Sequence, residues 1–310
     1  MKFVSYHAAV PRVGAVLGDP PALHDVLLDG DPWPSGLREL IEASGGDSRR
    51  ITAASPVSAP LSEIRVTAPV PDASKIIAAP VNYIDHQAEM NEASHIESLG
   101  VFLKAPSSLL GDGGTVRLPY HDRRFDQEGE LALIMGRTAR NVTPEQALAY
   151  VFGYTCLLDI TMRGGEDRST RKSFDTFTPM GPWLVTPDEV GDLGHLRLTC
   201  SVNGQLRQDA DVGDLIWGVP DLIAYASSVM TLLPGDVITT GTPAGVGPLT
   251  GGDQVSVSIS RIGLLSVTVD ATGALPCPTR GVGHGPVPPA ELTPIRGAAG
   301  SSPDLGGQPA

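Results

Sequence analysis

The short sequence Glu128-Gly129-Glu130, directly before the apolar run 131–135, constrains the fold of this chain more than any other feature. The apolar run predicts a buried strand, and residues two apart in a strand point to the same face. The two carboxylates are therefore expected side by side at the start of a buried strand. Because like charges repel, one carboxyl group is protonated or a cation lies between them.

A third carboxylate, Asp159, follows another apolar run at 151–158. Three carboxylates without a nearby His or Cys form a hard oxygen site, which suits Mg²⁺, Mn²⁺ or Ca²⁺ better than zinc. The alternative is that a Glu-x-Glu pair marks a solvated strand edge. The motif alone leaves both interpretations open, since its context has to confirm it.

Composition and charge exclude several classes of protein. The net charge of −13 over 310 residues disfavours binding to nucleic acid or to an anionic membrane surface. No apolar run approaches the roughly 18 residues of a membrane span, and His7, Pro11 and Arg12 interrupt the N-terminal apolar run, which argues against a signal peptide. The three cysteines are far apart in the sequence, which favours a reduced, cytoplasmic setting.

The pattern along the chain predicts a β-rich α+β protein with many turns, because 36 Gly and 28 Pro punctuate short apolar segments. We expect a small N-terminal β-rich domain over 1–68, a catalytic domain over 69–272 and a disordered tail rich in Gly, Pro and Ala over 273–310. Strands are expected at 3–6, 12–17, 75–79, 100–104, 115–118, 129–135, 152–159, 183–186, 196–203, 236–240 and 254–260. Helices are expected at 37–43, 85–98, 144–151 and 215–231.

His86 and Glu89 follow the strand expected at 75–79. On a helix, residues three apart share a face, and a carboxylate beside a His fixes its tautomer and makes it a general base. The alternative is a surface helix with an incidental His.

Two lysines and a Gly-rich loop complete the candidate positions. Lys104 ends a strand before a Pro-fixed turn, where it either binds an anion or is solvated. Lys172 precedes Phe174 and could neutralise a developing enolate or carboxylate. The loop 239–247 lacks the Lys of a phosphate-binding loop, but its backbone N–H groups and Thr242 could hold an oxyanion.

Six motifs in one order resemble the fumarylacetoacetate hydrolase family, over about residues 75–260. They are Asn-Tyr-x-x-His-x-x-Glu at 82–89, Phe-x-Lys-x-Pro-Ser at 102–107, Glu-x-Glu-Leu-Ala at 128–132, Gly-Tyr-x-x-x-x-Asp at 153–159, Lys-Ser-Phe-Asp-Thr-Phe at 172–177 and Gly-Thr-Pro-x-Gly-Val-Gly at 241–247. The resemblance implies that family's mixed β-roll catalytic domain, commonly as a homodimer.

The resemblance also implies residue roles. It implies Mg²⁺ or Mn²⁺ held by Glu128, Glu130 and Asp159. It implies catalytic roles for His86, Glu89 and Lys172, with His86 and Glu89 on a segment that closes as a lid. It implies that Thr176 lines the metal site and that Lys104, Arg163 and Thr242 contact the substrate.

The implied substrates are small anionic 2-oxo acids and 1,3-diketones. The leading interpretation is a metal-dependent hydrolase that cleaves a C–C bond in an acylpyruvate-like compound from aromatic or related catabolism. A decarboxylase or a tautomerase/isomerase of 2-oxo dicarboxylates is the alternative, because all three reactions stabilise the same enolate. A non-catalytic binding protein on the same scaffold is a third possibility.

One departure from the family concerns the expected substrate-binding position 166. Family members often carry Gln there, whereas this chain has Glu166, three residues after Arg163. An ionised Glu accepts hydrogen bonds but does not donate them. Either Glu166 pairs with Arg168 or Arg171 and faces away, or the substrate offers a donor there. Simple oxaloacetate-type substrates are disfavoured, and the charged run 167–171 suits a dianionic ligand.

Overall fold

The computed structural model describes residues 1–7, 10–57 and 63–295. In this part of the chain a mixed 12-stranded sheet has the order β4-β3-β2-β1-β14-β12-β11-β17-β6-β7, with β5 paired to β3 and β8 paired to β14. Its strands are β1 (Lys2–His7), β2 (Pro11–Leu17), β3 (Ala22–Leu28), β4 (Asp31–Pro32), β5 (Ile51–Pro56), β6 (Ile76–Ala78), β7 (Phe102–Lys104), β8 (Leu109–Leu110), β11 (Gly129–Met135), β12 (Val151–Leu158), β14 (Thr178–Val185) and β17 (Val237–Thr239).

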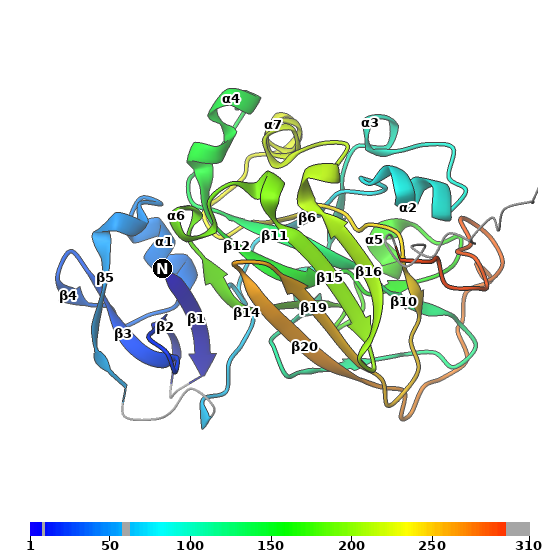
Figure 1. Cartoon of the computed structure of the whole chain (residues 1–310), viewed down its shortest axis with the longest axis horizontal. Helices are drawn as coiled ribbons and strands as arrows, with labels where there is room; N and C mark the ends of the chain where they lie inside the picture. Colours follow the sequence, from blue (N-terminus) through cyan, green and yellow to red (C-terminus); the bar gives the residue numbers. More distant parts are fainter. Residues whose placement is uncertain (8–9, 58–62, 296–310) are drawn as a thin grey trace, which may run out of the picture.

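Two smaller sheets complete the strands of the described residues. A five-stranded sheet in the order β16-β15-β19-β20-β9 packs against β11 and β12, and a three-stranded sheet pairs β13, β10 and β18 (Figure 1). Their strands are β9 (Thr115–Arg117), β10 (Phe125–Gln127), β13 (Thr161–Met162), β15 (Arg197–Val202), β16 (Gln205–Asp211), β18 (Gly247–Pro248), β19 (Gln254–Ile259) and β20 (Gly263–Asp270).

The helices of the described residues are short. They are α1 (Leu37–Ala43), α2 (Ile84–Glu89), α3 (Ile96–Leu99), α4 (Pro144–Ala147), α5 (Arg168–Arg171), α6 (Pro187–Val190) and α7 (Val219–Val229). The β-rich α+β class is confirmed, and α1 and β11 have the predicted bounds. The single helix predicted at 85–98 is wrong, because α2 ends at Glu89 and α3 begins only at Ile96. No helix in the described ranges is long and apolar enough to cross a bilayer.

Strand β11 is buried on both faces, which explains its uninterrupted apolar sequence. Leu131 and Leu133 belong to the core shared with the five-stranded sheet. Ala132 and Ile134 point the other way, into a core that they share with Phe3 and other N-terminal residues. The start of β11, which carries the paired carboxylates, is therefore held between two packed layers.

The N-terminal strands continue the main sheet. Strand β1 pairs antiparallel with β14, with Phe3 opposite Leu184, and the core around Phe3 crosses the boundary expected at residue 68. The N-terminal segment is thus β-rich as expected, but its sheet and core are shared with the catalytic part of the chain. Figure 1 shows these strands at one end of the molecule.

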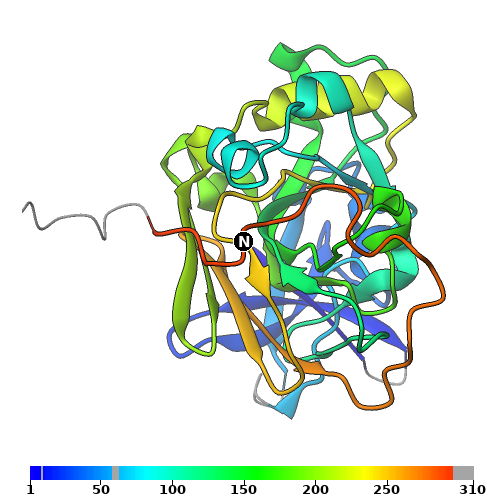
Figure 2. The ribbon, with the colours of Figure 1, turned by 90° about the vertical axis from the view of Figure 1, so that its right-hand side faces the viewer.

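The tail differs from the expectation of disorder over residues 273–295, while 296–310 lie outside the described residues. The backbone N–H of Cys277 donates to Asp122 (2.9 Å), and Gly281 accepts from the N–H of Gly165 (2.9 Å). Figure 2 shows the orange-to-red segment crossing the end of the molecule opposite to the N-terminal strands. Polar and backbone contacts hold this segment in place. Its order could therefore not be predicted from apolar periodicity in the sequence.

Candidate metal centre and active site

The pairing of β11 with β12 assembles the carboxylate cluster. The antiparallel register places Gly129 opposite Leu158 and Glu130 opposite Leu157. The backbone N–H of Asp159, just beyond β12, donates to the carbonyl oxygen of Glu128 at 2.8 Å. Glu128 and Asp159, which are 31 positions apart in the sequence, thereby become neighbours. The strand pattern alone did not specify which strands pair and so could not predict this contact.

Glu128, Glu130 and Asp159 are all buried, and one carboxylate oxygen from each lies within 4.8 Å of the others. Oxygens on opposite sides of an octahedral Mg²⁺ are roughly 4.2 Å apart, because each lies about 2.1 Å from the ion. No described residue donates a hydrogen bond to Oε1 of Glu130, which leaves that oxygen as a free acceptor. The donor set and its spacing therefore fit a divalent cation of the Mg²⁺ or Mn²⁺ type.

Buried cations surround this cluster. Lys172 Nζ donates to Oε2 of Glu128 (2.6 Å) and to Oδ2 of Asp159 (2.5 Å), and Arg163 lies 2.9 Å from Oε1 of Glu128. Burial alone would raise the pKa of Glu128, but Lys172 and Arg163 outweigh it and hold that pKa below its ordinary value. Burial and the neighbouring charge of Asp159 instead raise the pKa of Glu130 to about 8.

The Gly-rich loop 239–247 binds acidic side chains of this protein. The N–H of Gly241 donates to Oε2 of Glu130 (2.9 Å), which also accepts a hydrogen bond from Thr239. The N–H of Gly245 donates to Oε1 of Glu89 (2.9 Å). Gly245 has φ +104°, and a Cβ there would lie 1.8 Å from the carbonyl oxygen of Arg207, so only glycine fits.

The His86–Glu89 pair predicted from the i,i+3 spacing is present on α2. Nδ1 of His86 lies 2.9 Å from Oε2 of Glu89, and both side chains are buried. Burial would raise the pKa of Glu89, but hydrogen bonds from His86 and Thr293 lower it below its ordinary value. An ionised Glu89 requires a hydrogen on Nδ1 and leaves Nε2 of His86 as the free acceptor.

One member or more of each set lines a small cavity of about 30 Å³, a volume that fits one or two water molecules. His86, Glu128 and Glu130 line one part of it, and Thr242, bonded to Gly129 O (2.9 Å), lies beside them. Pro286 of the C-terminal segment forms another part of the wall. The cavity also has apolar lining residues, namely Ala79, Pro80, Val81, Met90 and Phe102.

Two expected site residues do not line the cavity. Lys104 was expected to contact the substrate, but its Nζ donates to Asp159 of the carboxylate cluster and to Phe177 O (3.0 Å). Burial lowers the pKa of Lys104. Thr176 was expected to line the metal site, but its Oγ1 accepts from the N–H of Arg117 (2.9 Å) at an exposed turn with φ 72°.

Glu166 faces away from the cavity, as one of the two predicted alternatives requires, but its predicted partners are wrong. Its oxygens accept two hydrogen bonds from Arg123 (2.5 and 2.6 Å) and one from Thr279 of the C-terminal segment. A Cβ at Gly281 would lie 2.4 Å from this carboxylate, so the segment passes close over it. Arg168 and Arg171 line the cavity and are not bonded to Glu166.

Sequence reasoning missed several partners of the site. Asp126 receives a hydrogen bond from Nε of Arg163 at 2.7 Å, and Thr293 donates to Oε1 of Glu89 at 2.5 Å. Asp126 stands two residues before Glu128 in a strand, so the period-two rule could have indicated it. Nothing local to Thr293 indicates its role, since its partner lies 204 residues away.

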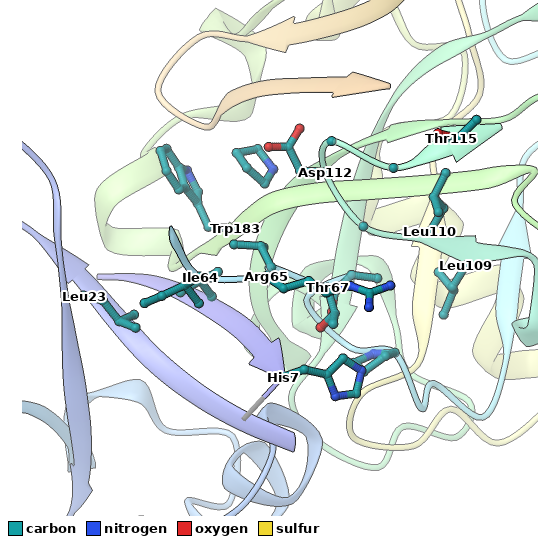
Figure 3. Close-up of a pocket in the computed structure, with 18 of the residues that line it drawn as sticks. His7, Leu23, Ile64, Arg65, Thr67, Leu109, Leu110, Asp112, Thr115 and Trp183 are labelled. Atoms are coloured by element: carbon teal, nitrogen blue, oxygen red, sulfur yellow. The ribbon is translucent and has the colours of Figure 1, made fainter. Parts of the chain in front are cut away.

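A second concave region is lined by other residues than the cavity of the carboxylates. It is a groove of about 1600 Å³ where the N-terminal strands meet the turn before β9, and Figure 3 shows Arg65, Asp112 and Trp183 on its wall. Thr176 lines this groove. Among the described residues, Glu128, Glu130 and Asp159 form the group of acidic, His or Cys side chains close enough to share a metal ion.

The fold and the site define a β-rich α+β protein with a buried, all-carboxylate centre for a divalent cation. The family model described as fumarylacetoacetate (FAA) hydrolase C-terminal matches residues 75–270. The chain belongs to the fumarylacetoacetate hydrolase family. Its fold, including the mixed β-roll predicted from the motifs, is that of this family.

Three relatives illustrate the range of the family. A maleylpyruvate hydrolase of Aquipseudomonas alcaligenes is 48% identical over 220 residues, covering 67% of this chain and 77% of that protein. An oxaloacetate tautomerase of Xenopus laevis is 35% identical over 284 residues, covering 86% and 88%. The crystal structure of maleylpyruvate hydrolase from Sphingobium sp. SYK-6 has a TM-score of 0.72 at 38% identity, covering 87% of this chain and 100% of that one. A further structure of that hydrolase is a complex with manganese(II) and pyruvate.

Proposed function

We propose that this protein is a divalent-metal-dependent hydrolase that cleaves a C–C bond in an acylpyruvate-like 2-oxo acid. The observation that carries the proposal is the shared cavity, where His86, bonded to Glu89, faces the same space as Glu128 and Glu130. A base beside a metal-binding cluster is the arrangement that hydrolysis of a chelating dicarbonyl requires.

Glu128, Glu130 and Asp159 would hold the cation, either Mg²⁺ or Mn²⁺. When bound, the cation acts as a Lewis acid on the carboxylate and the adjacent keto oxygen of the substrate. Lys172 is held by ion pairs with Glu128 and Asp159. Its buried positive charge would also stabilise negative charge on the substrate's keto oxygen. Arg163 and Thr242 line the cavity and are proposed to orient the bound 2-oxo acid.

His86 would start the reaction as a general base. Its Nε2 takes a proton from water, and the hydroxide attacks the carbonyl carbon distal to the 2-oxo acid. The C–C bond on the pyruvate side of that carbon then breaks, and its electron pair becomes the pyruvate enolate. Protonation of the enolate carbon yields pyruvate and a carboxylic acid, so one water is consumed. Glu89 keeps His86 oriented and stabilises its protonated form.

A tautomerase or isomerase is the second candidate, because an oxaloacetate tautomerase is among the relatives. The same base and charges would stabilise an enolate formed by proton removal. A decarboxylase would reach that enolate by loss of CO₂.

Product analysis separates these reactions. Purified protein is given maleylpyruvate with Mg²⁺, with Mn²⁺ or with a chelator, and the products are followed by NMR. We expect equimolar pyruvate and maleate with either ion and no turnover with the chelator. Isomer exchange or CO₂ release without a second acid would refute the hydrolase proposal, as would full activity after chelation. The ratio of the turnover rate with Mg²⁺ to that with Mn²⁺ identifies the preferred ion.

We also propose a homodimer in the cytoplasm, on the basis of family resemblance and of cysteines that form no disulfide in the described ranges. Light scattering coupled to size-exclusion chromatography tests the assembly, since a monomeric mass would contradict it.

A further inference from the structure

Arg171, the last residue of α5, is a buried cation in the cavity wall. Its side chain is 6% exposed, and its guanidinium makes no hydrogen bond or ion pair with any described residue. The other cavity cation near it, Arg163, is bonded to Asp126 and lies against Glu128. Arg171 therefore differs from its neighbour in having no acidic group within hydrogen-bonding distance, although the charges of Glu128 and Asp159 act on it from further away.

An unpaired buried charge is costly, so it calls for an explanation. Removing a guanidinium from water without a partner destabilises the folded protein, and a hydrophobic residue of similar size is commonly more stable there. Burial, Arg163 and Arg168 lower the pKa of Arg171, and the more distant carboxylates Glu128 and Asp159 offset this effect only in part. A protein keeps such a group where a ligand supplies the missing charge.

The lining of the cavity combines groups of opposite charge. Glu128 and Glu130 line it together with Arg168 and Arg171, which both belong to α5. Apolar side chains, including those of Met90 and Phe102, complete the lining. A linear molecule with a chelating 2-oxo acid at one end, an apolar middle and an anionic group at the other end matches this distribution.

We propose that Arg171, assisted by Arg168, binds the distal carboxylate of a dianionic acylpyruvate and makes the enzyme selective for dicarboxylic over monocarboxylic substrates. Planar guanidinium groups suit carboxylates because they offer two parallel N–H donors. The inference rests on the proposed hydrolase function and extends it to the substrate class.

The test compares two substrates of the same carbon chain and the same cis double bond. Maleylpyruvate carries the distal carboxylate, and isocrotonylpyruvate carries a methyl group in its place. Steady-state kinetics with Mg²⁺ are measured for the wild type, for Arg171→Met and for Arg171→Lys. Arg49→Gln, at a side chain that is 87% exposed, is the control.

For Arg171→Met we expect KM for maleylpyruvate to rise about 10- to 100-fold, the size of a lost charge-assisted hydrogen bond. KM for isocrotonylpyruvate should stay within about twofold, and Arg171→Lys should be intermediate. The thermal midpoint of Arg171→Met should be unchanged or higher, because an unpaired charge has been removed. Equal changes for both substrates, or a lower midpoint with unchanged selectivity, would overturn the proposal.

A separate binding arm distinguishes this proposal from the hydrolase proposal. If the wild type hydrolyses neither acylpyruvate, the hydrolase proposal fails, and Arg171 is then tested by calorimetric titration with maleate and with isocrotonate. Maleate binding that weakens about tenfold or more in Arg171→Met, with isocrotonate binding unaffected, supports the anion site. Equal maleate binding by wild type and variant overturns it.

Discussion

The groove is much larger than the carboxylate cavity, but the cavity has the higher density of charged side chains. The groove of about 1600 Å³ has polar side chains such as Arg65 and Asp112 on its wall, and none of the metal-binding cluster lies there. The cavity of about 30 Å³ is lined by carboxylates, a His, a Lys and three arginines. Volume therefore does not identify the reactive site in this protein, whereas the convergence of buried charges does.

The architecture explains the difference. The groove lies where the N-terminal strands meet the turn before β9, so its wall is made of segment ends that need not pack tightly. The cavity lies beside the start of β11, where Glu128 and Glu130 line it, and Pro286 of the C-terminal segment forms part of its wall. Because the cavity is small, we expect substrate entry to require displacement of a wall segment.

Removing a metal ligand should produce the largest effect. Glu128→Ala deletes one of three carboxylates and leaves Lys172 without one of its partners. We expect kcat/KM to fall about 10³-fold or more, because Lewis-acid stabilisation is worth several kcal/mol. Mn²⁺ binding, measured by electron paramagnetic resonance, should weaken in parallel. Undiminished Mn²⁺ binding would show that the carboxylates are not the metal site.

Removing the base should have the next largest effect. His86→Ala is expected to lower kcat about 10²- to 10⁴-fold, the usual contribution of general-base catalysis, while Mn²⁺ binding persists. Glu89→Gln should give a smaller loss, since His86 remains but loses its anionic partner. Activity unchanged in both variants would remove the dyad from the mechanism.

The C-terminal segment should have a moderate effect through Glu89. Thr293→Val deletes the hydrogen bond to Oε1 of Glu89 and should lower kcat about 3- to 10-fold, as expected for one hydrogen bond. Thr279→Val is the matched control, because it loosens the same segment at Glu166 without contacting the dyad. If both variants lose activity equally, docking of the segment rather than orientation of Glu89 is responsible.

Acid should release this segment through Glu166. Burial raises the pKa of Glu166, but hydrogen bonds from Thr279 and Arg123 outweigh it and lower the pKa to about 2, from an ordinary 4.5. A carboxyl group whose pKa is lower in the folded than in the unfolded state stabilises the folded state. This stabilisation is fully present at pH values above the unfolded-state pKa, and it is lost as the pH falls through the folded-state pKa.

Hydrogen exchange of residues 276–295, corrected for intrinsic rates, should therefore be constant from about pH 8 to 5 and rise below about pH 4. Glu166→Gln should exchange faster already at neutral pH, with little further change over this acidic range. Identical profiles for variant and wild type would contradict the role of Glu166 in docking.

A substitution in the groove should have the smallest effect. Arg65→Gln changes a side chain on the groove wall that does not line the carboxylate cavity, and kcat/KM should stay within about twofold of the wild type. A loss comparable to that of His86→Ala would show that the groove, despite its lack of clustered charges, takes part in the reaction.

Local spacing in the sequence determined the parts of the site whose residues are close together. Glu128 and Glu130 share a face because a strand repeats every two residues, and His86 reaches Glu89 because a helical turn brings i and i+3 together. The buried strand β11 and the β-rich class follow from apolar runs and turn residues. These features depend only on backbone geometry over a few residues.

Tertiary packing decided the remainder, because the partners are far apart in the chain. Arg123 meets Glu166 across 43 residues, and Thr293 meets Glu89 across 204. Lys104 binds Asp159 of the carboxylate cluster instead of lining the cavity, and Thr176 lies in the groove, although its motif suggested the active site. Which long-range partner a side chain meets depends on strand register and on how the sheets pack, and no short sequence pattern encodes either.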